Sequence, residues 1–470
     1  MWVESKPARP QWDNDAVLDG RSLAKLRSDH RGPVIDPADP SFVEARQTFN
    51  ALSDRRPLVI VRPVDARDAV IAVAFARDHG LPISVRGGGH SVAGHCAGDD
   101  SVMIDLRLLR EVAVDPVGRT ATVGGGALWS DVDARTQGYG LAMPGGTYGD
   151  TGVGGLTLSG GIGHLLGAFG MTLDNLVSAT VVTAAGGIVR ADAEQEPDLY
   201  WALRGGGGNF GIVTEFVSRV HEVGIMTGGL LAHRLQYATR VLRAFRDMSD
   251  GTPDALTCMP QLFPSSLLGE RERIFLTSVA YLGPPDEAEP FIQPLYQAAA
   301  PVHDTIGPMG YLQVQALFPP VPFGLRHYWT GRFLRELPDD VIDSVVERFA
   351  EGPDSSDNCV LFEPFHGAAR RVDPLDTAFG HRDARFNVSP MAIWEDPSLD
   401  EQEIEWAAGI RGLLEPLSFG GYLNYATDDS AETVTGAFGL EAFARLRAVK
   451  ARWDPDNVFR FNHNIPPTVP

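Results

Sequence analysis

The chain has 470 residues, 44% hydrophobic and 21% charged, which is typical of an ordinary globular protein of two or three domains. Its formal net charge is −21, which disfavours nucleic acid and membrane surfaces as partners, and no apolar run is long enough to predict a membrane span or a signal core. Three widely spaced cysteines do not form a disulfide framework, so a cytoplasmic location is expected.

The first half of the chain predicts short strands and helices. Residues 1–45 are polar and rich in Pro and Asp, so they are expected to be irregular or weakly helical. Residues 58–106 predict a β-α-β unit. The elements expected in this half are strands over 58–61, 81–86, 102–106 and 212–220, hairpins over 112–123 and 176–190, and helices over 65–79, 128–137 and 198–204.

Three glycine-rich stretches interrupt these elements, over residues 86–94, 144–163 and 205–211. The first contains three consecutive glycines, which tolerate positive φ and expose backbone N–H groups able to cradle a phosphate. His90 follows these glycines directly, so its imidazole is expected beside whatever the loop binds. A triple glycine alone is equally typical of a plain turn. Glycine-dense chain is costly to order, however, and three such stretches favour a bound ligand.

The second half of the chain differs, because glycine becomes rarer after about residue 222. This pattern predicts a separate antiparallel α+β domain. The tail over 449–470 contains a turn and an extended aromatic segment. The regular elements expected in this half are helices over 237–248, 339–350 and 401–414, and strands over 273–281 and 328–333.

Standard motifs for other activities fit poorly. His90, His95 and Cys96 do not have the spacing of a known metal site, so no metal is predicted. The stretch over 205–211 precedes a strand instead of opening a helix, which excludes a dinucleotide fingerprint. Residues 89–93 resemble a serine-hydrolase nucleophile elbow around Ser91, but the following residues are poor helix formers.

Five blocks in order resemble the FAD-linked oxidoreductases related to berberine bridge enzyme, within the vanillyl-alcohol oxidase superfamily. They are residues 86–94, 145–163, 174–176, 198–211 and 454–467. The resemblance implies an α+β, two-domain PCMH-type FAD-binding fold with an antiparallel-sheet substrate domain. The FAD-binding domain would comprise residues 1–221, completed by 430–470, and the substrate-binding domain residues 222–429.

The resemblance also implies which residues bind FAD. His90 matches the histidine that is bonded covalently to the flavin 8α-methyl group. Some relatives have a second link from a cysteine, but Tyr148 stands at that position and cannot form a thioether, and Cys96 is expected to be a small packed residue. A single link is therefore predicted. The cofactor-binding candidates are Arg86, Gly87, Gly88, Gly89, His90, Ser91, Gly94, Gly146, Thr151, Gly154, Gly155, Gly160, Gly161, Val213, Asn462 and Asn464.

Residues 422–425 resemble the family's Y-x-N-Y strand. The resemblance implies that Tyr425 is the catalytic base and that Tyr422 shapes the site. A free tyrosine has a pKa of about 10, so the base needs an activating neighbour, which the sequence does not identify. Packing of both tyrosines in a strand is the structural alternative.

The implied activity is oxidation of an alcohol, amine or activated C–H group of a small molecule by covalent FAD. Thr151 matches a position where relatives that react with O₂ carry a small side chain, which favours an oxidase that produces hydrogen peroxide. A dehydrogenase using another acceptor, a serine hydrolase and a non-redox flavin-binding protein are the alternatives. The substrate cannot be read from the sequence. Four aromatic residues could line its pocket but are more typical of core: Phe323, Tyr328, Trp329 and Trp394.

Overall fold

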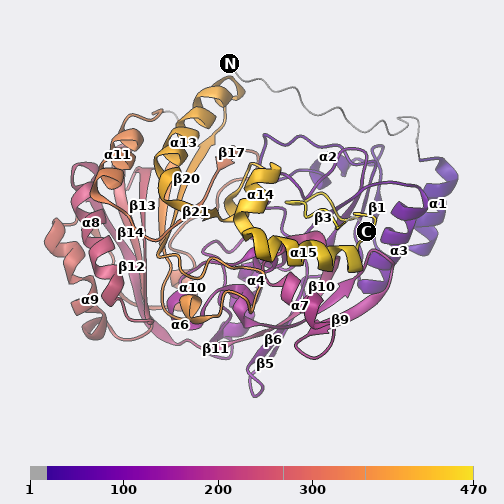
Figure 1. The fold of residues 1–470 in the computed structure, drawn as a ribbon, viewed down its shortest axis with the longest axis horizontal. Coiled ribbons are helices and arrows are strands. Elements are labelled where there is room, and N and C mark those ends of the chain that lie inside the picture. Colours follow the sequence, from indigo (N-terminus) through magenta and orange to yellow (C-terminus); the bar gives the residue numbers. More distant parts are fainter. Residues whose placement is uncertain (1–17, 268, 355, 469–470) are drawn as a thin grey trace.

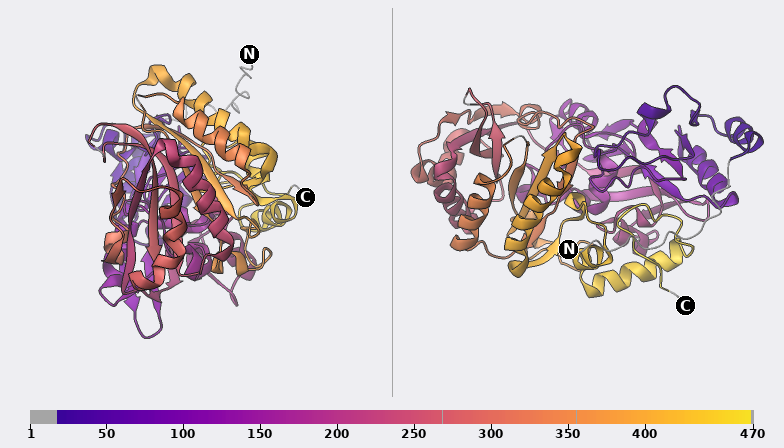
Figure 2. Two further views of the ribbon diagram at one scale, coloured as in Figure 1. Left: turned by 90° about the vertical axis from the view of Figure 1, so that its left-hand side faces the viewer. Right: turned by 90° about the horizontal axis from the view of Figure 1, so that it is seen from above.

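The computed structural model describes residues 18–267, 269–354 and 356–468. Its ribbon has two parts side by side, one formed by the N-terminal half of the chain and the other by most of the second half (Figure 1). The C-terminal helices, drawn in yellow, return from the second part and lie against the first (Figures 1 and 2). Helices and mostly antiparallel sheets make this an α+β chain, as predicted.

The predicted β-α-β unit is present in the first part. Strands β2 (Val59–Val61), β4 (Val102–Asp105) and β3 (Ile83–Arg86) pair in parallel in that order, and helix α3 (Ala66–Asp78) connects β2 to β3. The carboxylate of Asp65 caps α3 by accepting from two backbone N–H groups. The first glycine-rich loop therefore leaves the carboxyl end of a parallel strand, where ligands of such sheets bind.

Residues 18–45 of the N-terminal lead-in contain more regular structure than expected, whereas the expectation for residues 1–17 lies outside the described residues. Helix α1 (Gly20–Asp29) packs on α3, and the side chain of the preceding Asp19 caps it by accepting from the backbone N–H of Ser22. Strand β1 (Val34–Ile35) pairs with β2 at the antiparallel edge of the sheet, and helix α2 (Phe42–Ala45) follows.

Both predicted hairpins belong to a second, antiparallel sheet with the order β5-β6-β10-β8-β9. Strand β10 (Ile212–Arg219) is central and pairs with β6 and β8, so it joins the two hairpins. The other elements of this part are β5 (Val112–Asp115), β6 (Thr120–Gly124), α4 (Trp129–Gln137), β7 (Leu141–Ala142), α5 (Val153–Ser159), α6 (Leu166–Phe169), β8 (Leu176–Val182), β9 (Ile188–Asp192), α7 (Pro197–Leu203) and β11 (His221–Glu222).

The second part contains a large antiparallel sheet with the order β15-β12-β14-β13-β19-β20-β18-β21. The single strand predicted over 328–333 is two strands, because the chain breaks its pairing with β20 at Thr330 and Gly331. The strands are β12 (Ile225–Arg234), β13 (Leu256–Ser265), β14 (Glu272–Tyr281), β15 (His303–Asp304), β16 (Gly307–Gly310), β17 (Arg326–Trp329), β18 (Arg332–Leu334), β19 (Cys359–Pro364), β20 (Phe386–Trp394) and β21 (Ser418–Gly421).

Helices α8 (Ala238–Met248), α9 (Pro285–Ala298), α11 (Asp339–Ala350) and α13 (Asp400–Leu414) cover one face of the large sheet, as Figure 2 shows. Residues of the central strands, such as Cys258 and Leu262 of β13, pack under these helices, and the residues between them face the other side. Because both faces are buried, these strands show no regular alternation of polar and apolar residues, and the sequence analysis therefore missed β12, β13, β19 and β20. Two short helices, α10 (Tyr311–Val314) and α12 (Ala368–Arg371), lie in its connections.

The C-terminal segment contains two helices that were not predicted, α14 (Ala431–Phe438) and α15 (Leu440–Trp453). Lys450 of α15 is fully buried, and its ammonium donates to Asp454 Oδ2 at 2.6 Å. The same ammonium donates to the carbonyls of Asn209, at 2.7 Å, and Phe459, at 2.9 Å. This lysine therefore ties the tail to the third glycine-rich loop.

The strands up to β11 and those from β12 onward form separate sheets. On this basis we propose two domains. The first comprises residues 1–221 and 430–470, and the second comprises residues 222–429.

The two parts are joined by a buried ion pair, in which Arg382 donates to both carboxylate oxygens of Asp174, at 2.7 and 2.9 Å. Among the described residues, no helix has the length and apolarity needed to cross a bilayer.

We expect Lys450→Met to lower the free energy of unfolding by about 3–5 kcal/mol, because it leaves the Asp454 carboxylate buried without its cation. The same substitution at Lys25, whose pair with Asp29 is exposed, is the matched control and should leave the free energy of unfolding nearly unchanged. Urea unfolding followed by circular dichroism measures both values. Equal small losses would show that the buried pair does not anchor the tail.

Candidate active site

A cavity of about 700 Å³ lies between the glycine-rich loops and the face of the large sheet opposite helices α8, α9, α11 and α13. All three glycine-rich stretches predicted from the sequence contribute to its lining. The lining glycines are Gly87, Gly88, Gly89, Gly125, Gly146, Gly152, Gly154, Gly155, Gly206, Gly207, Gly208 and Gly211. Bare backbone therefore faces the cavity over much of its surface.

The first two loops touch at Gly88 and Gly152. A Cβ added to Gly88 would lie 2.5 Å from the Cα of Gly152, and a Cβ on Gly152 would lie 2.4 Å from the nitrogen of Gly88. Gly155 and Gly208 differ, because a Cβ on either would meet nothing within 4 Å. The first pair is thus required for loop packing, whereas the second pair faces open space in the cavity.

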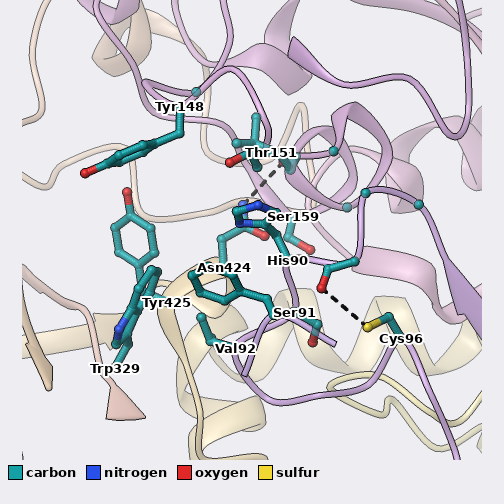
Figure 3. Close-up of a pocket in the computed structure, with 18 of the residues that line it drawn as sticks. His90, Ser91, Val92, Cys96, Tyr148, Thr151, Ser159, Trp329, Asn424 and Tyr425 are labelled. Atoms are coloured by element: carbon teal, nitrogen blue, oxygen red, sulfur yellow. Dashed lines mark hydrogen bonds between the residues drawn. The ribbon is translucent and has the colours of Figure 1, made fainter. Parts of the chain in front are cut away.

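His90 is held on three sides, and 14% of its side chain is exposed. Its Nε2 lies 3.2 Å from Oδ2 of Asp150, which comes from the second loop. Phe49 stacks on the imidazole with ring centroids 4.4 Å apart, and Phe323 packs edge-on at 5.1 Å. Figure 3 shows His90 in the cavity with Tyr148, Thr151 and Tyr425 around it.

The neighbour of Tyr425 that the sequence did not identify is a carboxyl group. The Tyr425 hydroxyl donates to Oε1 of Glu363 at 2.8 Å, and Asn387 donates to the other oxygen at 2.6 Å. Burial raises the pKa of Glu363 to about 7, although both hydrogen bonds oppose this shift. Burial, and then the nearby Glu363, raise the pKa of Tyr425 well above its usual value. Tyr425 is therefore a neutral hydroxyl bonded to a carboxyl that titrates near neutrality.

Tyr422 has a supporting position. Its hydroxyl accepts from the backbone N–H of Gly161 at 2.8 Å and from the amide of Asn424 at 2.9 Å, and burial raises its pKa. The predicted Y-x-N-Y strand is wrong, because β21 ends at Gly421 and residues 423–425 form a 3₁₀ turn. In a strand, residues three apart face opposite sides, whereas the turn brings both tyrosines to the cavity.

The structure brings most predicted cofactor-binding residues to the cavity. Those that line it are Gly87, Gly88, Gly89, His90, Ser91, Gly146, Thr151, Gly154, Gly155, Val213 and Asn462. Those outside its lining are Arg86, Gly94, Gly160, Gly161 and Asn464.

The residues outside the lining support it from behind. Arg86 is buried and donates to the carbonyls of Ala45 and Gln47. These hydrogen bonds fix the segment that precedes Phe49. A Cβ on Gly160 would lie 2.6 Å from the ring of Tyr422, so bare backbone is needed there. These positions shape the cavity without facing it.

Four residues of the site were not identified from the sequence: Phe49, Asp150, Glu363 and Asn424. Glu363 had a local signal, because it is the one charged residue in the otherwise apolar strand β19. Among the four candidate aromatic residues, Trp329 lines the cavity, whereas Tyr328 and Trp394 pack in the core of the sheet.

Other chemistries gain no support from the geometry. The Ser91 hydroxyl accepts from the backbone N–H of His95 at 3.1 Å, and no helix follows it, unlike in a nucleophile elbow. Cys96 is buried as a small packed residue, with its sulfur 3.6 Å from the carbonyl of Gly89. Within the described ranges, no three His, Cys, Asp or Glu side chains are grouped as metal ligands.

Comparison with known proteins gives two family matches. Residues 57–192 match the family described as FAD binding domain, and residues 421–466 match that described as berberine and berberine like. The first match contains the first two glycine-rich stretches and His90, and the second contains both tyrosines and Asn462.

Relatives match along nearly the whole chain. (R)-6-hydroxynicotine oxidase of Paenarthrobacter nicotinovorans is 31% identical, over 93% of this chain and 97% of that protein. A solved structure of 6-hydroxy-D-nicotine oxidase from Arthrobacter nicotinovorans has a TM-score of 0.84 at 30% identity, over 93% of this chain and 98% of that chain. Glucooligosaccharide oxidase of Acremonium strictum, which has a 6-S-cysteinyl, 8α-N1-histidyl FAD, has a TM-score of 0.86 at 24% identity, over 96% and 100% of the two chains. The predicted PCMH-type fold is confirmed.

We expect Gly88→Ala to destabilise the protein by about 1–3 kcal/mol, because the new Cβ overlaps the backbone of Gly152. Gly436→Ala, in helix α14 with open space around it, is the control and should be neutral or stabilising. Thermal unfolding measures both. A Gly88→Ala protein as stable as wild type would show that the two loops need not touch.

Proposed function

We propose that this chain, which belongs to the berberine and berberine-like family of FAD-linked oxidoreductases, is an oxidase. It would oxidise a small organic molecule with FAD bound through His90. The observation that carries the proposal is one cavity lined both by His90, on a bare-backbone cradle, and by Tyr425, whose hydroxyl is hydrogen-bonded to the buried Glu363. Bound FAD would supply the two-electron oxidation, accepting hydride from the substrate and passing the electrons to O₂ to form hydrogen peroxide.

The residues present fit FAD. Exposed N–H groups of glycine-rich loops suit a pyrophosphate, and the open space at Gly155 and Gly208 leaves room for close approach. Val213 and Asn462 line the same cavity, and the buried Oδ1 of Asn462 lacks a hydrogen-bond partner in the described structure. We assign these residues and the lining glycines to the cofactor.

We propose that His90 is the residue attached to the 8α-methyl group of the flavin. A carboxylate can only accept, so the contact with Asp150 places the imidazole proton on Nε2 and leaves the lone pair of Nδ1 free to form the bond. Asp150 is thus a positioning residue. Tyr148 occupies the position of the second link in some relatives and offers no thiol, and we therefore propose a single bond.

Tyr425 and Glu363 would remove the substrate proton together. The raised pKa of Tyr425 disfavours a free tyrosinate. As the Tyr425 oxygen takes the substrate proton, its own proton can pass along the 2.8 Å hydrogen bond to the Glu363 carboxylate. Tyr422 and Asn424 hold the turn in place, and we propose that O₂ reaches the flavin past the small side chain of Thr151, which lines the cavity.

We expect His90→Ala to leave FAD extractable by denaturation, whereas wild-type protein should retain the added mass of FAD. Asp150→Asn should slow covalent attachment by about tenfold, because it weakens one charge-assisted hydrogen bond to His90. Asp429→Asn is the matched control, because Asp429 contacts Nε2 of His95 at the same 3.2 Å. Intact-protein mass spectrometry during reconstitution with FAD measures attachment. Covalent FAD in His90→Ala would refute the linkage.

We expect anaerobic flavin reduction to accelerate as the pH rises through about 7, because Glu363 accepts a proton only as a carboxylate. Glu363→Gln should remove this rise and slow reduction by about 10²–10⁴-fold, as should Tyr425→Phe. Glu395→Gln, an exposed change at the end of β20, should leave the profile unchanged. Stopped-flow absorbance gives the rates, and an unaltered pH profile in Glu363→Gln would assign the proton to another group.

A further inference from the structure

We propose that the substrate is an uncharged, largely apolar and aromatic molecule, and not a saccharide. The inference rests on the proposed function, because it concerns the molecule oxidised in this cavity. It follows from the sheet and loop residues that complete the cavity beyond the glycine-rich cradle.

The face of the large sheet opposite its four helices supplies an apolar wall to the cavity. In strand β13 the cavity residues Met259 and Phe263 alternate with residues packed under the helices. The same alternation places Leu361 of β19 and Ile393 of β20 in the cavity. Period-2 alternation means that this wall is determined by every second residue of the strands.

The connection over 317–322 extends the wall with few hydrogen-bonding groups. Three of its six residues, Pro319, Pro320 and Pro322, have no backbone N–H. Phe318 on this connection lies with its ring centroid 6.1 Å from that of Tyr148, and Trp329 lies near Tyr425 on another side (Figure 3). The wall thus offers aromatic surfaces on which a flat ring can pack.

The polar side chains of this wall are few, and most are already engaged. Ser265 accepts from the backbone N–H of Leu267 at 3.1 Å, and Asp357 pairs with Arg271 at 2.8 Å. Two side chains are exceptions. Gln261 is 7% exposed, lines the cavity and makes no side-chain hydrogen bond within the described residues, and the buried Nε1 of Trp329 has no partner there. Within the same residues, no Lys or Arg lines the cavity.

These features discriminate between substrate classes. A saccharide carries a hydroxyl on most of its carbons, and the cavity would bury them with few uncommitted partners, chiefly the Gln261 amide and the Tyr148 hydroxyl. Each unpaired buried hydroxyl weakens binding. An anionic molecule would lose its hydration without meeting a Lys or Arg, and the Asp357 carboxylate that a cation would need is already paired with Arg271. An aromatic molecule instead replaces water on Phe318 and the strand residues, and one polar group on it can meet Gln261.

The test uses the FAD-containing protein and two primary probes, 2-naphthylmethanol and cellobiose, added without oxygen. Perturbation of the visible flavin spectrum reports binding, and bleaching reports oxidation. We expect 2-naphthylmethanol to bind about a hundredfold more tightly than cellobiose. Equal binding, or tighter binding of cellobiose, would overturn the proposed substrate class.

Variants locate the interaction. Phe318→Ala, on a connection outside the strands, should weaken 2-naphthylmethanol binding about tenfold. Phe291→Ala, the same change on the exposed side of helix α9, should leave binding unchanged. Unchanged binding in Phe318→Ala, in protein with wild-type thermal stability, would contradict the assigned wall.

The two readouts separate this inference from the proposed function. Tight binding of 2-naphthylmethanol with no bleaching by any member of an aromatic alcohol and amine panel supports the substrate class and counts against the oxidase. Bleaching by cellobiose supports the oxidase and overturns the substrate class.

Discussion

The contact between Gly88 and Gly152 is the constraint on which the site depends. With backbone atoms this close, no side chain fits at either position. Asp150 stands two residues before Gly152, and His90 stands two residues after Gly88. Bringing the glycines together therefore brings the carboxylate to the imidazole. A packing requirement of bare backbone thus sets the geometry of the residue that would carry the cofactor.

Around this contact the fold adds rigidity from distant parts of the chain. Phe49 stacks on His90 and donates its backbone N–H to the carbonyl of Gly89. Arg86 holds the segment before Phe49 through the carbonyls of Ala45 and Gln47. The C-terminal segment is bound to the third loop by Lys450. The cradle is therefore supported from both ends of the chain.

The opposite side of the cavity combines a costly group with an apolar surface. Glu363 is buried in an apolar sheet, where only two hydrogen bonds compensate the loss of hydration, and its pKa rises to about 7 as a result. A carboxyl with this pKa can exchange a proton near neutral pH. The apolar residues around it exclude water, and the same residues favour an apolar substrate. In the proposed mechanism, proton transfer and substrate choice would therefore share one physical origin.

The sequence by itself determined the glycine-rich stretches, the position of His90 and most elements of the first part, because these depend on local propensity and short motifs. It also placed Tyr422 and Tyr425 together, although as a strand. Tertiary structure alone decided that both tyrosines turn into the cavity, that Glu363 is the partner of Tyr425 and Asp150 that of His90, and that β13, β19 and β20 form the apolar wall. Those features arise from contacts between residues tens to hundreds of positions apart, and a strand buried on both faces loses the alternation that would reveal it.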